Sequence, residues 1–151
     1  LYGPNDKFTW TESKVIAALI RKCIERQNPL PVWGDGEDLK DFLYIDDFIE
    51  GLLTAFENSK EFETINIASS IPVTIKDIIN IILKVEGCEN TEVKFDTTMP
   101  TMLPKRLINT DKIRKLGNWE PKVPLEEGIS KTIIWYKEYF KEKTPEEKYD
   151  N

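Results

Sequence analysis

Apolar residues recur every three to four positions in long stretches of this chain, which is the spacing of one helix face. Asp46 or Asp47 is the expected N-cap of the stretch over residues 46–57. Thr74 with Asp77 approximates a capping box for the stretch over residues 74–87. Together with a shorter segment before Gly117, the pattern predicts helices over residues 14–26, 46–57, 74–87, 110–116 and 124–141.

Short runs with alternating or β-branched apolar residues predict the strands. They cover residues 30–33, 64–68 and 93–95, and Gly34-Asp35-Gly36 supplies a turn after the first. Two or three short strands make no proper sheet alone, so either they pair with each other or at least one belongs to a larger sheet supplied by other residues. The expected fold class is therefore α/β, small and mostly helical.

Composition narrows the function classes. With 151 residues the chain fits one domain, and its net charge of −6 argues against a nucleic-acid partner. No apolar run reaches the roughly 18–20 residues of a membrane span, so no membrane is expected. The chain has no His, which removes His-based triads, and Cys23 and Cys88 are too few for a Cys-rich metal site. Without secretory features the default is a cytoplasmic protein with reduced thiols.

The remaining chemistry is carried by carboxylates, phenols and cations. Gly34 and Gly36 do not open a helix and fail as a dinucleotide fingerprint, so we interpret them as a plain turn. Tyr139 and Lys143 have the spacing of a phenol–ammonium pair, but they lie at a fraying helix end. Basic residues from separate segments either converge on a diphosphate or are scattered surface charges. They are Lys14, Lys22, Lys40, Lys105 and Arg106.

An ordered set of short strings adds a family resemblance that spans residues 1–140. The strings are Tyr2-Gly3-Pro4, Trp33-Gly34-Asp35-Gly36, the segment 40–47 (KDFLYIDD), Asn66-Ile67-Ala68, and Pro104-Lys105-Arg106 with Leu116-Gly117. In this order and spacing they resemble the C-terminal part of the extended short-chain dehydrogenase/reductases, the NAD(P)-dependent sugar-nucleotide epimerase/dehydratase family. Within it the resemblance is strongest to the branch that epimerises and reduces GDP-sugars.

The resemblance implies a domain organisation. Residues 1–143 would form a sugar-nucleotide-binding domain and residues 144–151 a frayed tail, whereas the N-terminal Rossmann domain of the family is absent from this sequence. The strand over residues 65–68 would join the edge of that missing sheet. NADP or NAD would be bound mainly by the missing domain, so this chain holds no cofactor-binding residue. The substrate would be a nucleotide-diphosphate sugar, with a GDP-sugar favoured, and the full-length enzyme a homodimer.

The resemblance also implies residue roles. Lys14 stands where the similar enzymes have a His proposed as proton donor, so it is a candidate catalytic acid that departs from the pattern. Lys40 stands where the similar enzymes have an Arg that binds the diphosphate. The replacement keeps the positive charge but loses the planar guanidinium, which can bind two phosphate oxygens at once. Lys105 and Arg106 match a diphosphate-binding Arg-Lys pair in swapped order. The residues expected to line or flank the nucleotide are Val15, Leu19, Lys22 and Trp33.

The function expected is thus the sugar-nucleotide-binding part of an NAD(P)-dependent epimerase/reductase. Because the phosphate loop and catalytic Tyr-Lys pair are absent, the chain alone should be inactive. Two alternatives stay open: another nucleotide-sugar epimerase or dehydratase of the same family, or a non-catalytic domain that binds a nucleotide or a protein. Removal of a Rossmann domain should also leave an apolar patch over the second helix and residues 65–68, which favours association.

Overall fold

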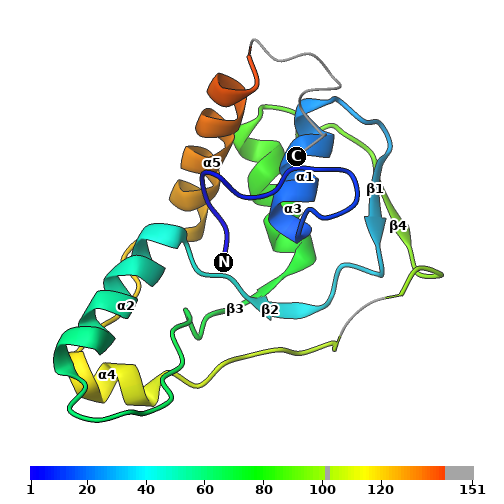
Figure 1. The fold of residues 1–151 in the computed structure, drawn as a ribbon. Coiled ribbons are helices and arrows are strands. Elements are labelled where there is room, and N and C mark those ends of the chain that lie inside the picture. The colour runs from blue at the N-terminus through cyan, green and yellow to red at the C-terminus, as the bar shows by residue number, and fades with distance from the viewer. Residues whose placement is uncertain (101–102, 142–151) are drawn as a thin grey trace.

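The computed structural model describes residues 1–100 and 103–141, which form an α/β fold. Figure 1 shows helices α1, α3 and α5 grouped together, with α2 and α4 lying to one side of them. The described residues contain five helices and four strands, in agreement with the expected class.

The strands form two separate two-stranded sheets. Strand β1 (Leu30–Trp33) pairs in parallel with β4 (Val93–Asp96), with Leu30 opposite Val93. Strand β2 (Leu39–Asp41) pairs antiparallel with β3 (Pro72–Thr74), with Leu39 opposite Thr74. The sequence predicted β1 and β4 but neither β2 nor β3, because three-residue strands carry too little periodicity to detect.

The predicted strand over residues 64–68 was wrong for this chain. The segment belongs to neither sheet, and the nearest strand, β3, begins four residues later at Pro72. A strand needs a neighbouring strand whose backbone forms hydrogen bonds with its own. Alternation of apolar and polar residues in the sequence does not supply that neighbour. The Asn66 side chain instead donates to the Asn109 carbonyl, 3.2 Å away.

The main hydrophobic core lies between α1 (Val15–Ile24), α3 (Ile75–Val85), α5 (Leu125–Tyr139) and β1. Helix α3 begins with the predicted capping box: the Thr74 hydroxyl accepts from the Asp77 backbone N–H at 3.0 Å, and Asp77 Oδ2 accepts in return from the Thr74 backbone N–H at 3.1 Å. Helix α5 ends at Tyr139, two residues before the predicted end. The tail predicted for residues 144–151 lies outside the described residues.

A second, smaller core joins α2 (Ile45–Asn58) to α4 (Asp111–Gly117). It consists of the buried residues Leu43, Ala55, Ile113 and Trp119. Any side chain at position 51 would force neighbouring atoms to move, since a Cβ added to Gly51 would lie 2.9 Å from the Trp119 ring. The close approach of α2 to Trp119 therefore depends on this glycine.

The predicted N-cap of α2 was also wrong. Tyr44 occupies the N-cap position with no side-chain cap, and both Asp46 and Asp47 lie in the first turn. Asp47 is buried, and its two carboxylate oxygens accept from the backbone N–H groups of Lys122 and Val123, each at 3.0 Å. Local sequence favours a cap at either aspartate, but Asp47 instead makes a tertiary contact with the backbone donors of residues 122–123.

No helix in the described residues is long and apolar enough to cross a membrane.

Candidate functional site

The segment that contains Lys40 lies beside the segment that contains Lys105 and Arg106. The Leu39 backbone N–H donates to the Pro104 carbonyl at 2.8 Å, and the Arg106 N–H donates to the Leu39 carbonyl at 2.9 Å. This is a parallel bridge that pairs Leu39 with Lys105. Side chains alternate between faces along extended backbone, so the register puts Lys40 and Arg106 on one face and Lys105 on the other. Arg106 is thus the member of the Lys105–Arg106 pair that shares a face with Lys40.

Lys40 is held by local partners. Its Nζ lies 3.0 Å from Asp38 Oδ2 and also donates to the carbonyl of Leu103. The side chain is only 16% exposed, so water screens this pair less than it screens surface pairs. A diphosphate bound at Lys40 would compete with the Asp38 carboxylate for the same ammonium group.

Asp41 connects β2 to two further segments. One of its carboxylate oxygens accepts from the Ser69 N–H at 2.9 Å and the Ser69 hydroxyl at 2.7 Å, and the other accepts from the Ser70 N–H at 2.8 Å. The Ser70 hydroxyl in turn donates to the Ile108 carbonyl at 2.7 Å and lies 2.8 Å from the Thr110 hydroxyl. The network fixes the strand of Lys40 relative to the segment that follows Arg106.

Sequence reasoning missed this network. Asp41 directly follows Lys40, but its partners come from residues far along the chain, and no spacing rule links them. Ser70 adopts a positive φ of 59°, which turns the backbone so that consecutive N–H groups of Ser69 and Ser70 face the Asp41 carboxylate.

A groove of about 380 Å³ lies beside this network. It begins one residue after Arg106, and both backbone and side chains of the segment before α4 form its wall. The lining residues are Ser70, Leu107, Ile108, Asn109, Thr110, Asp111 and Arg114. None of them was among the predicted site residues, because single polar residues in a loop carry no pattern.

The start of α1 lies in the same neighbourhood. Lys14 occupies the N-cap position and is exposed. The charged groups of Lys14 and Arg106 are both close enough to the backbone nitrogen of Leu1 to interact with it electrostatically. Both cations therefore lie within electrostatic reach of one point, and the N-terminal residue is drawn near α1 and β2 in Figure 1.

The other predicted residues of α1 face different surroundings. Val15 is exposed, whereas Leu19 is buried in the main core, where its side chain packs against other apolar groups. Lys22 is partly buried and donates to the Pro31 carbonyl at 2.8 Å, which connects α1 to β1. Burial lowers the pKa of Lys22, with Arg21 adding to the effect.

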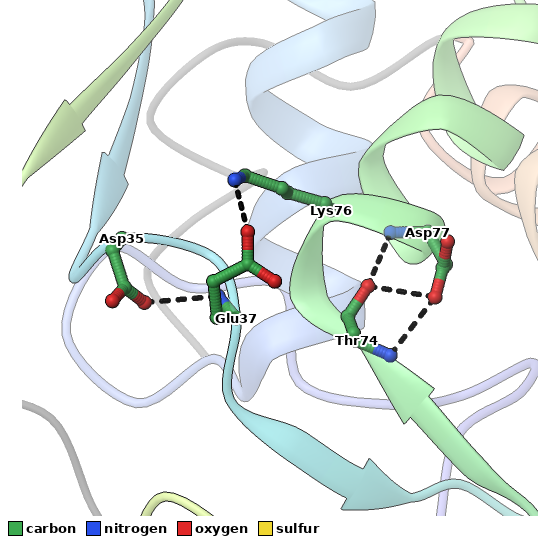
Figure 2. A network of polar contacts seen from close by, with 5 residues as sticks. All are labelled: Asp35, Glu37, Thr74, Lys76 and Asp77. Carbon is green, nitrogen blue, oxygen red and sulfur yellow. Dashed lines mark hydrogen bonds and ion pairs between the residues drawn. The ribbon is translucent and has the colours of Figure 1, made fainter.

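Trp33 ends β1 with its side chain 57% exposed, next to the turn Gly34-Asp35-Gly36. In Figure 2 the Asp35 carboxylate accepts from the Glu37 backbone N–H at 2.9 Å, and Lys76 pairs with the Glu37 carboxylate. Gly36 has a φ of +82°, and a Cβ there would lie 2.5 Å from the Phe95 ring.

The same turn shows whether this chain can hold a dinucleotide. The turn leads into β2 instead of a helix, and the space above Gly36 is filled by Phe95 and Lys76. It is therefore a structural turn, and the described residues offer no Gly-rich cradle for a dinucleotide phosphate there.

The predicted Tyr139–Lys143 pair has one member in the described part of the chain. Tyr139 stacks on Trp135 with ring centroids 4.8 Å apart, and Lys143 lies outside the described residues.

Comparison with known proteins shows which family this chain resembles. A family profile described as "NAD dependent epimerase/dehydratase family" matches residues 1–68. GDP-L-fucose synthase 1 of Arabidopsis thaliana is 36% identical over 140 residues, which cover 90% of this chain and 43% of that protein. This chain therefore resembles the NAD-dependent epimerase/dehydratase family in its first 68 residues and GDP-L-fucose synthase over 90% of its length.

Further proteins are similar to this chain in sequence and in fold. GDP-L-fucose synthase of Escherichia coli K12 is 32% identical over 151 residues, covering 91% of this chain and 46% of that protein. The crystal structure of a GDP-L-fucose synthetase from Naegleria fowleri bound to NADP superimposes with a TM-score of 0.85 at 26% identity, over 93% of this chain and 45% of that one. This chain thus spans less than half the length of these family members.

Proposed function

We propose that this chain forms the substrate-binding part of an NAD(P)-dependent nucleotide-sugar epimerase/reductase that acts on a GDP-sugar. The observation that carries the proposal is the bridge between Leu39 and Lys105, which brings Lys40 and Arg106 to one face. Two cations on one face match the two negatively charged phosphates of a diphosphate. The choice of a GDP-sugar is supported by the named relatives, which are GDP-L-fucose synthases.

In this proposal the chain binds and orients the substrate. Lys40 and Arg106 hold the diphosphate, and Trp33 supplies an exposed aromatic face for the base. The groove beside Ser70 and Arg114 takes the part of the ligand next to the diphosphate. Fixing the diphosphate and the base limits the orientations of the sugar, which is how such contacts accelerate a reaction elsewhere in a site.

The Gly34–Gly36 turn does not fit the phosphates of a nicotinamide dinucleotide. The Gly34–Gly36 turn is filled by Phe95 and Lys76, and the sequence contains no G-x-x-G-x-x-G loop. We therefore assign cofactor binding to a Rossmann domain outside this sequence. In that arrangement the extended residues 64–68 add to the edge of its sheet and gain the backbone partners that they lack here.

Lys14 is the proposed acid for the epimerisation step. It lies at the start of α1, in the same electrostatic neighbourhood as Arg106. An ammonium at this position carries a proton that it can donate, but it is a weaker acid than the imidazolium of the similar enzymes, and it adds positive charge near the diphosphate.

The first prediction tests the two cations in the complete protein encoded by the gene. Lys40→Ala and Arg106→Ala should each weaken binding of GDP by about 10- to 150-fold, because a charge-assisted contact contributes roughly 1.5–3 kcal/mol. Lys40→Arg should hold or improve the affinity, since the planar guanidinium grips two oxygens. Calorimetric titration with GDP and UDP measures these affinities and shows which base is preferred.

Lys84→Ala is the matched control. Lys84 lies in the last turn of α3 and pairs with Glu126 at 2.9 Å, with both side chains more than half exposed, so its removal changes the net charge by the same amount without touching the proposed site. If Lys40→Ala and Arg106→Ala bind GDP and UDP within twofold of wild type, the two residues are surface charges and the proposal fails.

A further inference from the structure

The only two cysteines of the sequence lie against each other. Cys23 belongs to α1 and is buried, whereas Cys88 follows the end of α3 and is partly exposed. Their sulfur atoms are 3.1 Å apart although the residues are 65 positions apart in sequence. A disulfide bond has a length of about 2.05 Å, so the two sulfurs need to approach by only about 1 Å to form one.

The surrounding backbone holds both cysteines in place. Helices α1 and α3 pack against each other in the main core, and the Cys88 N–H donates to the Leu83 carbonyl at 2.9 Å. Gly87, with a φ of +62°, makes the turn that directs Cys88 back toward α1. Neither sulfur serves the site described above, and the structure requires no thiol pair for its core, where two apolar side chains would pack as well.

We propose that Cys23 and Cys88 are a disulfide-forming dithiol that reacts with small-molecule disulfides such as oxidised glutathione. The juxtaposition of the two sulfurs at the ends of packed helices carries this inference, which does not depend on the proposed function.

The accessible thiol reacts first. Cys88 loses its proton to solvent and attacks one sulfur of the oxidant, which forms a mixed disulfide and releases one glutathione thiolate. Burial raises the pKa of the Cys23 thiol to about 12, and Cys88 and Glu86 contribute to the increase, so Cys23 stays protonated until the second step.

In the second step Cys23 gives its proton to solvent and attacks the sulfur of Cys88, which releases the second glutathione thiolate. The two protein thiols lose two electrons and two protons in total. One molecule of oxidised glutathione takes them up and becomes two molecules of glutathione.

The bond would stabilise the fold without rearranging it. It closes a loop of 65 residues between α1 and the turn after α3, which reduces the entropy of the unfolded chain. Because the sulfurs are already adjacent, little native strain opposes this gain. For a protein of this size the expected increase in Tm is about 5–10 °C.

The test is oxidation of the complete protein with oxidised glutathione, followed by alkylation, tryptic digestion and mass spectrometry without reduction. Trypsin releases Cys23 in the peptide 23–26 and Cys88 in the peptide 85–94. We expect a cross-linked species of these two peptides, lighter by two hydrogens than their sum, and a higher Tm that returns to its starting value after reduction.

Cys23→Ser and Cys88→Ser are the matched variants. Cys88→Ser should form no cross-link and show no change in Tm on oxidation, and Cys23→Ser should stop at the glutathione adduct of Cys88. The proposal is overturned if wild type keeps both thiols free, if it stops at the same adduct as Cys23→Ser, or if either cysteine cross-links to a different residue.

Discussion

Helices α2 and α3 have similar apolar periodicity but opposite environments. In α3 the apolar stripe is buried in the main core, and Ile78 has no exposed surface. In α2 the only buried residues are Asp47, Gly51 and Ala55, while Ile49 is 48% exposed and Phe56 82% exposed. An amphipathic pattern shows that a helix face needs an apolar partner, and it does not show whether that partner is in the same chain.

The two helices are therefore held by different forces. Helix α3 is fixed by contacts with α1 and α5 on either side. Helix α2 contacts α4, and its start is fastened by the Asp47 carboxylate to residues 122–123. The large exposed side chains near it are Ile49, Leu52, Leu53, Phe56 and Phe62, which we call the α2 patch. The proposed Rossmann domain would cover this patch.

The largest effect is expected for a matched pair of truncations, Ile78→Ala and Ile49→Ala. Ile78→Ala should lower the free energy of unfolding of the 151-residue chain by about 2–5 kcal/mol, because it leaves a cavity in the main core. Ile49→Ala should change it by less than about 0.5 kcal/mol, since the side chain is already half in water. Urea unfolding followed by circular dichroism measures both, and equal losses would contradict the comparison.

The same two substitutions give a sharper test when their unfolding free energies are measured in the complete protein. If residues outside this sequence cover the α2 patch, Ile49→Ala should become a core truncation there and cost about 2 kcal/mol or more. An unchanged small cost in the complete protein would mean that the patch stays exposed.

A smaller effect is expected at the polar attachment of α2. Asp47→Ala should destabilise the chain by about 1.5–3 kcal/mol, because two partly buried hydrogen bonds from backbone N–H groups lose their charged acceptor. Asp46→Ala is the control, since Asp46 is exposed in the same helical turn and should cost under about 0.5 kcal/mol. Hydrogen exchange should show faster exchange at the Lys122 and Val123 amides in the first variant only.

Substitutions in the α2 patch should have the smallest effect on the free energy of unfolding. They should nevertheless clearly change the self-association of the chain. The 151-residue chain should associate with increasing concentration, because contiguous apolar surface of a few hundred Å² favours self-contact. The double variant Leu53→Lys with Phe56→Glu should reduce this association with little change in unfolding free energy. Light scattering tests both statements, and a chain that is monomeric at millimolar concentration would contradict the first.

The sequence by itself determined the elements that depend on local chemistry. Helices α1, α3 and α5 were predicted within a few residues of their bounds, and the Thr74–Asp77 capping box was confirmed, because both depend on residues within one or two helical turns. Strands β1 and β4 were likewise predicted from their runs of apolar residues. The order of the short strings also indicated the family that the chain resembles.

Tertiary structure decided what depends on distant partners. Residues 64–68 have the alternation of a strand but pair with no strand in the described part of the chain, and Asp47 was predicted as a cap but accepts from donors 75 and 76 residues away. The shared face of Lys40 and Arg106 and the meeting of Cys23 with Cys88 were equally beyond local rules, since both arise from chain segments that only folding brings together. Periodicity encodes which face of an element is apolar, whereas the identity of the group that meets that face is set by the path of the whole chain.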